Sequence, residues 1–240
     1  MSGSIFVGRG TTQLAAINGD PEVSQSHSLL SDINAALEEA KLTLPDVDLF
    51  VCTSGPGSFT GLRIGIATLK ALAATLGRPC VGIPTLEAVA HAAGVSAATV
   101  ALLPAGRGEL FAQLFSVSED QSVTAIDAAA HLSPPRLLEK YSARKDLLWA
   151  GPGAHQHREL LEGFAKQLGI DFAGGSIDSS DYAGPQRGNI WRLAPKETNL
   201  ARHAAALGLL KFERGEVQSA HTVRAIYVRP SDAELNQQCP

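Results

Sequence analysis

One stretch of this sequence constrains the fold more than any other: an apolar helix of which almost the whole circumference must be buried. From Leu62 to Leu76 the only charged residues are Arg63 and Lys70. Their spacing places both on one stripe of the helix, and the other positions are apolar or small. A sheet covers one side of a helix, so the rest should meet another helix of this chain or of a partner. A helix that lies wholly inside the chain fits the pattern equally well.

The residues before this helix indicate an α/β fold. The run Val47–Thr53 is apolar without alternation around Leu49–Cys52, which is typical of a strand covered on both faces. A glycine-rich loop then leads into the helix. Gly61 and Gly65 lie one helical turn apart, and we expect them to let another backbone come close.

The second half of the chain repeats the order of the first. A strand, Asp146–Ala150, is again followed by Gly-Pro-Gly and by a helix that reaches about Leu168. We therefore expect two related α/β domains, over residues 1–98 and 99–215, and a C-terminal tail over 216–240. The other expected elements are short strands at Ser4–Val7 and Gln13–Ile17, helices over 28–41 and 199–212, a long loop at Ala173–Asn189 and a tail strand at Val223–Val228.

Composition narrows the class of protein. Hydrophobic residues make up 45% of the chain and charged residues 18%, which suits a well-buried core. A net charge of −4 makes the chain a poor RNA binder on its own. The three cysteines form no CxxC pair, and neither a signal segment nor a membrane-length apolar run is found. We expect a cytoplasmic protein that does not enter a membrane.

The loop before the apolar helix is the strongest candidate for binding chemistry, because backbone N–H groups at a helix start can receive an anion. Its spacing, however, does not match known phosphate motifs. Gly61 is followed by Leu62 rather than by the lysine of a P-loop, and the glycines miss GxGxxG by one position. The alternative is a tight strand-to-helix turn that fixes Phe59 and the helix behind it. The candidate phosphate loop comprises Ser54, Gly55, Gly57, Ser58 and Thr60.

No set of catalytic or metal-binding residues emerges. Ser58 lacks the GxSxG context of a nucleophile elbow. The histidines are scattered without an HxxxH or HExxH pattern. His155 and His157 form an HxH pair, but residues two apart on a helix point in different directions. We therefore expect no catalytic residue and no metal site.

The loop and helix resemble a known signature. Residues 54–68, from Ser-Gly-Pro-Gly-Ser-Phe-Thr-Gly onward, are closely similar to the motif of the TsaB (YeaZ) family. Further segments agree in order: His27-Ser28, Gly82–Ala88, Arg107–Phe111 and Tyr227–Glu234 resemble the family's His-Ser pair, next strand and helix cap, hairpin and closing segment. The likeness spans most of the chain.

The resemblance implies an ASKHA-type fold of two ribonuclease-H-like domains, which agrees with the repeated order of elements. It also implies a role as a scaffold or activator. The family has no catalytic activity of its own and pairs with its catalytic paralogue, TsaD. Together with the ATPase TsaE, the pair transfers a threonylcarbamoyl group, supplied as an adenylate by TsaC, to N6 of a tRNA adenosine beside the anticodon. TsaD binds metal through an HxxxH element, whereas Ser31 follows His27 here at that spacing.

The resemblance further implies that helices of the first domain bind TsaD or, alternatively, a second copy of the chain in a homodimer. This chain then contacts TsaE and the tRNA only as part of the complex with TsaD. No cofactor of its own is expected, and ATP or ADP at the partner interface stays open. The expected partner-binding residues are Phe59, Leu62, Arg63, Ile66, Ala67, Leu69, Lys70 and Ala73.

Two departures from the family set limits on these expectations. The family opens with a strand that ends in Asp-Thr-Ser, which has no counterpart here, so the first sheet should be one strand short. Pro104 stands where the family's hairpin begins with aspartate. Both departures argue against nucleotide binding by this chain alone. They also weaken the alternative function, an ASKHA-group enzyme such as a kinase or a glycopeptidase-like hydrolase, which needs an aspartate near the phosphate and a metal site.

Overall fold

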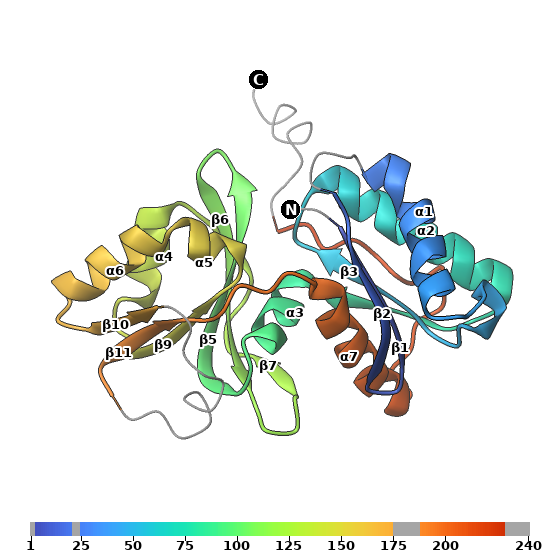
Figure 1. Cartoon of the computed structure of the whole chain (residues 1–240). Helices are drawn as coiled ribbons and strands as arrows, with labels where there is room; N and C mark the ends of the chain where they lie inside the picture. Colours follow the sequence, from blue (N-terminus) through green and yellow to red (C-terminus); the bar gives the residue numbers. More distant parts are fainter. Residues whose placement is uncertain (1–2, 21–24, 175–187, 229–240) are drawn as a thin grey trace. The chain divides into compact units, whose positions relative to one another are not determined.

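The structure, a computed structural model, describes residues 3–20, 25–174 and 188–228 and divides the chain into two compact units (Figure 1). The first unit comprises Met1–Ala92 and Glu197–Ala225, and the second comprises Ala93–Lys196 and Ile226–Pro240. Both units combine helices with a β-sheet, so the expected α/β class is confirmed. The division differs from the expected boundaries, because the chain returns to the first unit near its C-terminal end.

The strands of the first unit form two separate pairs. An antiparallel hairpin joins β1 to β2, whereas β3 and β4 run parallel to each other. Among the described residues no ladder of hydrogen bonds connects the two pairs. The strands are β1 Ser4–Arg9, β2 Thr12–Asn18, β3 Phe50–Gly55 and β4 Cys80–Pro84.

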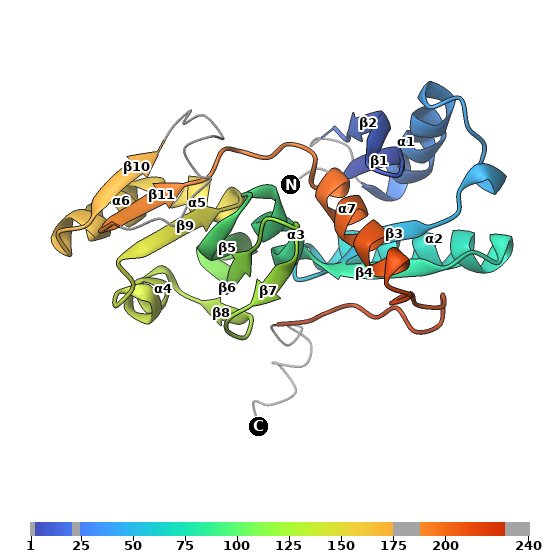
Figure 2. The ribbon, with the colours of Figure 1, turned by 90° about the horizontal axis from the view of Figure 1, so that it is seen from below.

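Helices cover both faces of these strand pairs. Helix α1 packs on β1 and β2, and α2 packs on β3 and β4 while also contacting α1. Figure 2 shows α7 lying across the unit between the two strand pairs, where it contacts β1, β3 and β4. Helix α3 packs beside α7. The helices are α1 Gln25–Glu39, α2 Phe59–Leu76, α3 Thr85–Ala92 and α7 Leu200–Glu213, with a short 3-10 turn at Leu44–Asp46.

Specific hydrogen bonds place α7 in the first unit, although the expected boundary put it in the second domain. Asn199 caps the helix by accepting from the backbone N–H of Arg202 at 3.2 Å. Its side-chain amide donates to the backbone oxygens of Ile5 and Ile17, at 3.2 Å and 3.3 Å. The cap thus ties α7 to the β1–β2 hairpin. Sequence order alone carries no sign of this return.

Gly208 shows how closely α7 approaches the strands. A Cβ atom at this position would lie 2.9 Å from Cγ1 and 3.2 Å from Cβ of Val51 on β3, and closer still to Cγ2. Rotating the valine cannot clear all three atoms. The helix must therefore shift to accept any side chain there.

We expect Gly208→Ala to destabilise the protein by roughly 1–3 kcal/mol, because overpacking outweighs the higher helix propensity of alanine. Gly163 in α6 is the matched control, since a Cβ there meets no atom within 4 Å. Gly163→Ala should instead stabilise by about 0.5–1 kcal/mol. Urea unfolding measures both. Equal effects of the two substitutions would contradict the close packing of α7 on β3.

The second unit contains a seven-stranded sheet in the order β10-β11-β9-β5-β6-β7, with β8 paired to β6. Its core includes Trp149 and Trp191, both fully buried, with ring centroids 5.0 Å apart. The expected single helix after Ala150 is divided in two. The elements are β5 Ser96–Gly106, β6 Glu109–Val117, β7 Val123–Ala125, β8 Ala130–Leu132, α4 Pro134–Tyr141, β9 Asp146–Ala150, α5 Pro152–Gln156, α6 Arg158–Gln167, β10 Asp171–Gly174 and β11 Ile190–Leu193.

Two expectations about irregular segments change. The predicted tail strand Val223–Val228 does not form. Val223 is 1% exposed, whereas Ile226 and Tyr227 are exposed, and no described strand pairs with this segment. The tail instead pairs with β4 through a single bridge between Cys80 and Gln218. Most of the predicted long loop at Ala173–Asn189 lies outside the described residues.

Candidate docking surface and its loop

The loop between β3 and α2 is held at both ends. Gly55 adopts φ 111°, a value that favours glycine, and its N–H donates to Oγ1 of Thr85 at 3.1 Å. The Gly55–Pro56 peptide bond is cis. At the far end Ser58 caps α2, with its Oγ accepting from the N–H of Gly61 at 3.3 Å. The helix therefore begins at Phe59, earlier than the predicted Leu62.

This arrangement divides the candidate phosphate loop. Ser54 and Gly55 are buried, so they cannot line an open anion site, whereas Gly57, Ser58 and Thr60 are exposed. The Ser58 side chain already satisfies one N–H of the first helical turn. The alternative reading, a tight turn that fixes the start of α2, accounts for these contacts directly.

One stripe of α2 belongs to the core of the first unit. Leu62, Ile66, Leu69 and Ala73 are between 1% and 9% exposed. They recur at the spacing of one helical face, and Ile66, Leu69 and Ala73 pack in one cluster with Cys80 and Val223. Four of the eight predicted partner-binding residues are therefore buried within the chain, because this stripe covers β3 and β4.

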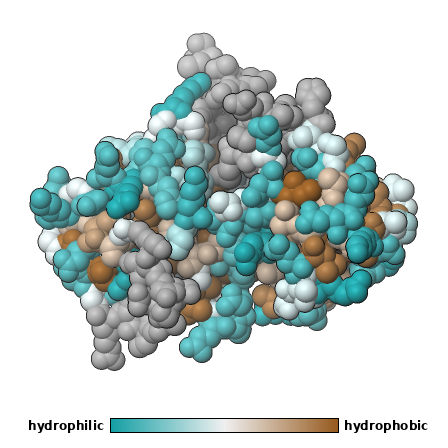
Figure 3. Space-filling model, in the orientation of Figure 1, coloured by the Kyte–Doolittle hydropathy of each residue, from teal (hydrophilic) through white to brown (hydrophobic). Residues whose placement is uncertain are grey.

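The other four predicted residues form the outer face of α2, which we define as Phe59, Arg63, Ala67 and Lys70. Phe59 is 41% exposed, and the guanidinium carbon of Arg63 lies 3.8 Å from the centre of its ring. Ala67 is exposed and Lys70 half-buried. Figure 3 shows hydrophobic residues at the surface of this part of the first unit, around α1 and α2.

The flank of the buried stripe opposite the outer face is also open. A Cβ atom added at Gly65 would meet no atom within 4 Å. The helix that the sequence predicts to be over-apolar is thus covered by its own chain on one side only. The alternative that it lies wholly inside the chain does not hold.

Helix α2 also has the length and composition of a membrane span, with a mean hydropathy of 1.3 over 18 residues, and among the described helices it alone passes that test. Its buried stripe packs on β3 and β4, and its ends are fixed by the Ser58 cap and by Gly77. These contacts are those of a helix within a folded unit.

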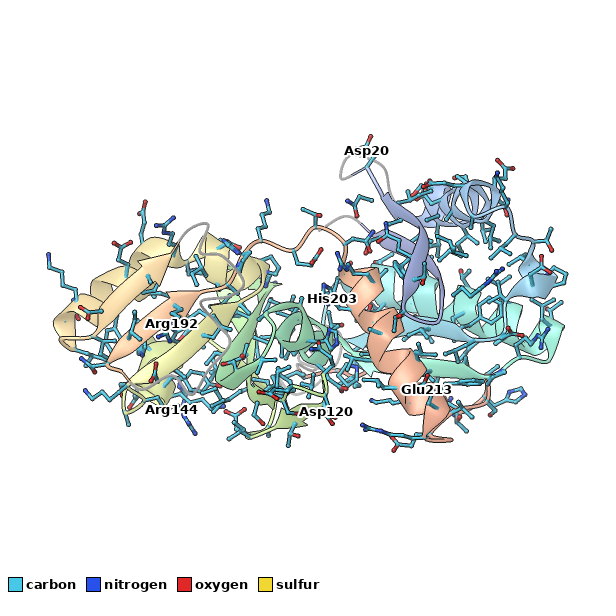
Figure 4. All side chains as sticks on the ribbon, turned by 60° about the horizontal axis from the view of Figure 1, so that its bottom comes forward. Asp20, Asp120, Arg144, Arg192, His203 and Glu213 are labelled. Carbon is cyan, nitrogen blue, oxygen red and sulfur yellow. The ribbon has the colours of Figure 1, made fainter. Side chains whose placement is uncertain are left out.

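A histidine pair that the sequence did not reveal links α3 to α7. Nδ1 of His91 lies 2.9 Å from Nδ1 of His203, and Nε2 of His203 lies 2.9 Å from Oε2 of Glu197. Figure 4 shows His203 projecting from α7. The Glu197 carboxylate accepts a hydrogen bond from Nε2–H of His203, so the neutral His203 ring carries its proton on Nε2. Nδ1 of His203 then accepts the hydrogen bond that Nδ1–H of His91 donates. Nε2 of His91 is then unprotonated, buried and without a hydrogen-bond partner.

Both histidines resist protonation. Burial, together with the nearby His203 and Arg202, lowers the pKa of His91 to about 4. Burial likewise lowers the pKa of His203, against the opposing effect of Glu197. The pair lies 112 residues apart in sequence, so no local pattern predicts it.

Stability should therefore fall as the pH drops from about 6.5 towards 4. The folded-state pKa of His91 lies below the unfolded value of 6.5, so the folded chain binds fewer protons and is most stable above that pH. The expected loss is roughly 3 kcal/mol at the acid end. His91→Gln should flatten the pH dependence measured by urea unfolding. His221→Gln, at an exposed position, is the control and should leave it unchanged.

No group of three or more histidine, cysteine, aspartate or glutamate residues that could hold a metal occurs in the described part of the chain. His155 lies in α5 and His157 in the turn between α5 and α6, and they do not form such a group. Glu109 contacts His131 at 2.9 Å. The side chain of His27 lies outside the described residues.

Comparison with known proteins gives the family. Residues 21–169 match the TsaD family, described as tRNA N6-adenosine threonylcarbamoyltransferase. A protein of that name from a Chelativorans species is 49% identical over 55 residues, which cover 23% of this chain and 15% of that protein. The TsaB protein of Buchnera aphidicola, a tRNA threonylcarbamoyladenosine biosynthesis protein, is 40% identical over 65 residues, covering 27% of this chain and 31% of that protein.

An uncharacterized protein of Mycobacterium tuberculosis is 32% identical over 111 residues, covering 46% of this chain and 52% of that protein. The matched regions thus span about half or less of the curated relatives' lengths. Among solved structures, YeaZ from Pseudomonas aeruginosa superimposes with a TM-score of 0.68 at 23% identity and covers 93% of both chains. These neighbours have the two-domain ASKHA-type fold that the sequence predicts. The chain therefore belongs to the TsaD family.

Proposed function

We propose that this chain is a non-catalytic subunit that binds a TsaD-type transferase and supports the transfer of a threonylcarbamoyl group to N6 of a tRNA adenosine. The observation that carries the proposal is the outer face of α2, which combines exposed apolar side chains with two positive ones and is positioned by the loop before it. The reaction is inferred from the names of the Buchnera and Chelativorans relatives.

The chemistry of the outer face indicates what the partner presents. Phe59 and Ala67 offer apolar contact, and both are exposed. The charged residues of this face, Arg63 and Lys70, are both positive. A complementary partner surface is an apolar helix with acidic residues at its margin.

The rest of the assembly follows from this role. TsaE and the tRNA meet the chain through TsaD, since the net charge of −4 does not favour RNA binding by the chain alone. ATP or ADP reaches the interface only together with TsaD, because three of the five candidate phosphate-loop residues are buried or already hydrogen-bonded. The complex works in the cytoplasm.

Co-expression with the TsaD protein of the same organism tests the proposal. We expect a stoichiometric complex in sedimentation velocity at micromolar concentrations, and threonylcarbamoyl transfer to tRNA only when both proteins are present with TsaE. The isolated chain should hydrolyse neither ATP nor peptides. Magnesium-dependent ATP turnover by the isolated chain would favour an ASKHA-group enzyme instead, and the lack of a complex would remove the proposal.

A homodimer through the same face competes with the TsaD complex. Light scattering of the chain with and without TsaD separates the two. We expect any dimer to dissociate when TsaD is added, since both partners need the outer face of α2. A dimer that persists in the ternary mixture would place self-association elsewhere on the chain.

A further inference from the structure

Two of the three places where the chain crosses between the units lie beside one hydrogen-bonded group of side chains. The chain leaves the first unit after Ala92, at the end of α3, and returns to it at Glu197, shortly before α7. His91 is in the last turn of α3, and His203 is in the first turn of α7. Glu197, His203 and His91 are joined in that order by two hydrogen bonds of 2.9 Å each. Within the first unit, side chains thus link the two crossings.

Glu197 holds the second crossing through both of its carboxylate oxygens. Oε1 accepts from the backbone N–H groups of Thr198 and Asn199, at 2.8 Å and 2.6 Å, and Oε2 accepts from His203. Burial opposes the charge of Glu197, but its hydrogen bonds lower the pKa overall, so the group is a carboxylate at neutral pH. The backbone that leads into α7 therefore depends on Glu197, and the position of Glu197 depends on His203.

His91 brings the first crossing into the same group. It is 8% exposed, and its ring meets the ring of His203 edge to face, with centroids 5.2 Å apart and an interplanar angle of 61°. Since Nε2 of His91 has no hydrogen-bond partner, the bond from Nδ1 to His203 orients this buried ring. A second polar contact joins the same two helices farther from the crossings, where Lys211 lies 3.4 Å from Glu87.

We propose that Glu197, His203 and His91 form a latch that orders both crossings together, so that breaking it at one crossing loosens the backbone at the other. The closed latch joins the end of α3 to the start of α7 through hydrogen bonds that are largely shielded from water, where each bond is strong and the loss of one leaves its partner unsatisfied. The latch lies within the first unit and does not depend on the partner bound at the outer face of α2.

Acid should open the latch, because neutral His203 accepts at Nδ1. A proton on that atom would set two N–H donors against each other across 2.9 Å. Burial lowers the pKa of both histidines, so the latch is closed at neutral pH and opens as the pH falls well below 6.5. Arg202 opposes protonation, whereas Glu197 favours it. The other titratable residues on α3, α7 and the strands that pack on them are Glu87, Lys211, Glu213, Arg9, Cys52 and Cys80.

Amide hydrogen exchange of the whole chain, followed by NMR at neutral pH, tests the latch without TsaD. His91→Leu removes the donor on α3, and the protection factors of Thr198 and Asn199 at the other crossing should fall at least about tenfold. His91→Asn places an amide N–H near the position of Nδ1 and should restore the protection. Val81 in β4 should stay protected in both variants, which shows that the first unit remains folded.

Lys211→Met is the matched control, because it removes the ion pair with Glu87 between the same two helices and leaves the latch intact. It should keep Thr198 and Asn199 protected. Acidification from about pH 7 to about pH 4 should lower the protection of these amides in the unchanged chain, but not further in His91→Leu, where the latch is already open. The proposal is overturned if His91→Leu leaves this protection unchanged, if His91→Asn fails to restore it, or if Lys211→Met lowers it equally.

Discussion

A chain carrying Ala67→Glu should fold normally and lose its complex with TsaD. Ala67 is exposed on α2, so glutamate stays in water in the free protein. In the complex the carboxylate would be desolvated and would offset the positive charge that Arg63 and Lys70 present to the acidic margin of the partner, so binding should lose several kcal/mol. We expect affinity to fall by at least about 100-fold, equivalent to about 2.7 kcal/mol. Isothermal titration or sedimentation against purified TsaD measures the loss.

Two measurements make this result specific. The melting temperature of Ala67→Glu should match that of the unchanged chain, which excludes unfolding as the cause. Ala143→Glu introduces the same charge at an exposed turn of the second unit and should leave the affinity as it was. If Ala67→Glu binds TsaD as well as the control does, the outer face of α2 is not the docking surface.

The position of that face could be foreseen from the sequence only in part. Composition alone shows that Leu62–Leu76 is too apolar for one sheet to cover. Which side of α2 faces the core depends on the residue at which the helix begins and on the path of the loop that joins it to β3. The Ser58 cap and the Gly55 contact with Thr85 fix that rotation, and a contact across 30 residues leaves no periodic signal. The predicted contact set therefore mixed both stripes of α2.

The return of the chain to the first unit was beyond sequence reasoning for the same reason. The order of strands and helices predicts two α/β domains that follow one another, because hydrophobic periodicity and turn residues report only on neighbouring parts of the chain. The assignment of α7 depends on Asn199 reaching the backbone oxygens of Ile5 and Ile17, more than 180 residues away. The contact of His91 with His203 follows from the same return. Local sequence pattern predicts where helices and strands form, whereas buried polar contacts between distant segments determine which of them pack together.

Leu69→Glu should have the opposite signature to Ala67→Glu, although the two positions are two residues apart. Leu69 is 5% exposed and packs in the core of α2, β4 and the tail with Ile66 and Ala73. Glutamate there forfeits about 1.5–3 kcal/mol of apolar burial and adds the cost of a buried, unpaired charge. The sum, roughly 5 kcal/mol, is comparable to the whole stability of many domains.

We therefore expect Leu69→Glu to unfold the first unit, seen as loss of dispersed NMR signals from α2 and β4, and to lose TsaD binding as a consequence. Leu69→Met conserves volume and should cost less than about 1.5 kcal/mol while keeping the complex. The difference between the two glutamate variants shows which side of α2 faces the core, because a charge destabilises the fold only at a buried position. Were Leu69→Glu to fold and Ala67→Glu to unfold, α2 would be turned about its axis relative to this structure, and the docking face would have to be assigned to the opposite stripe.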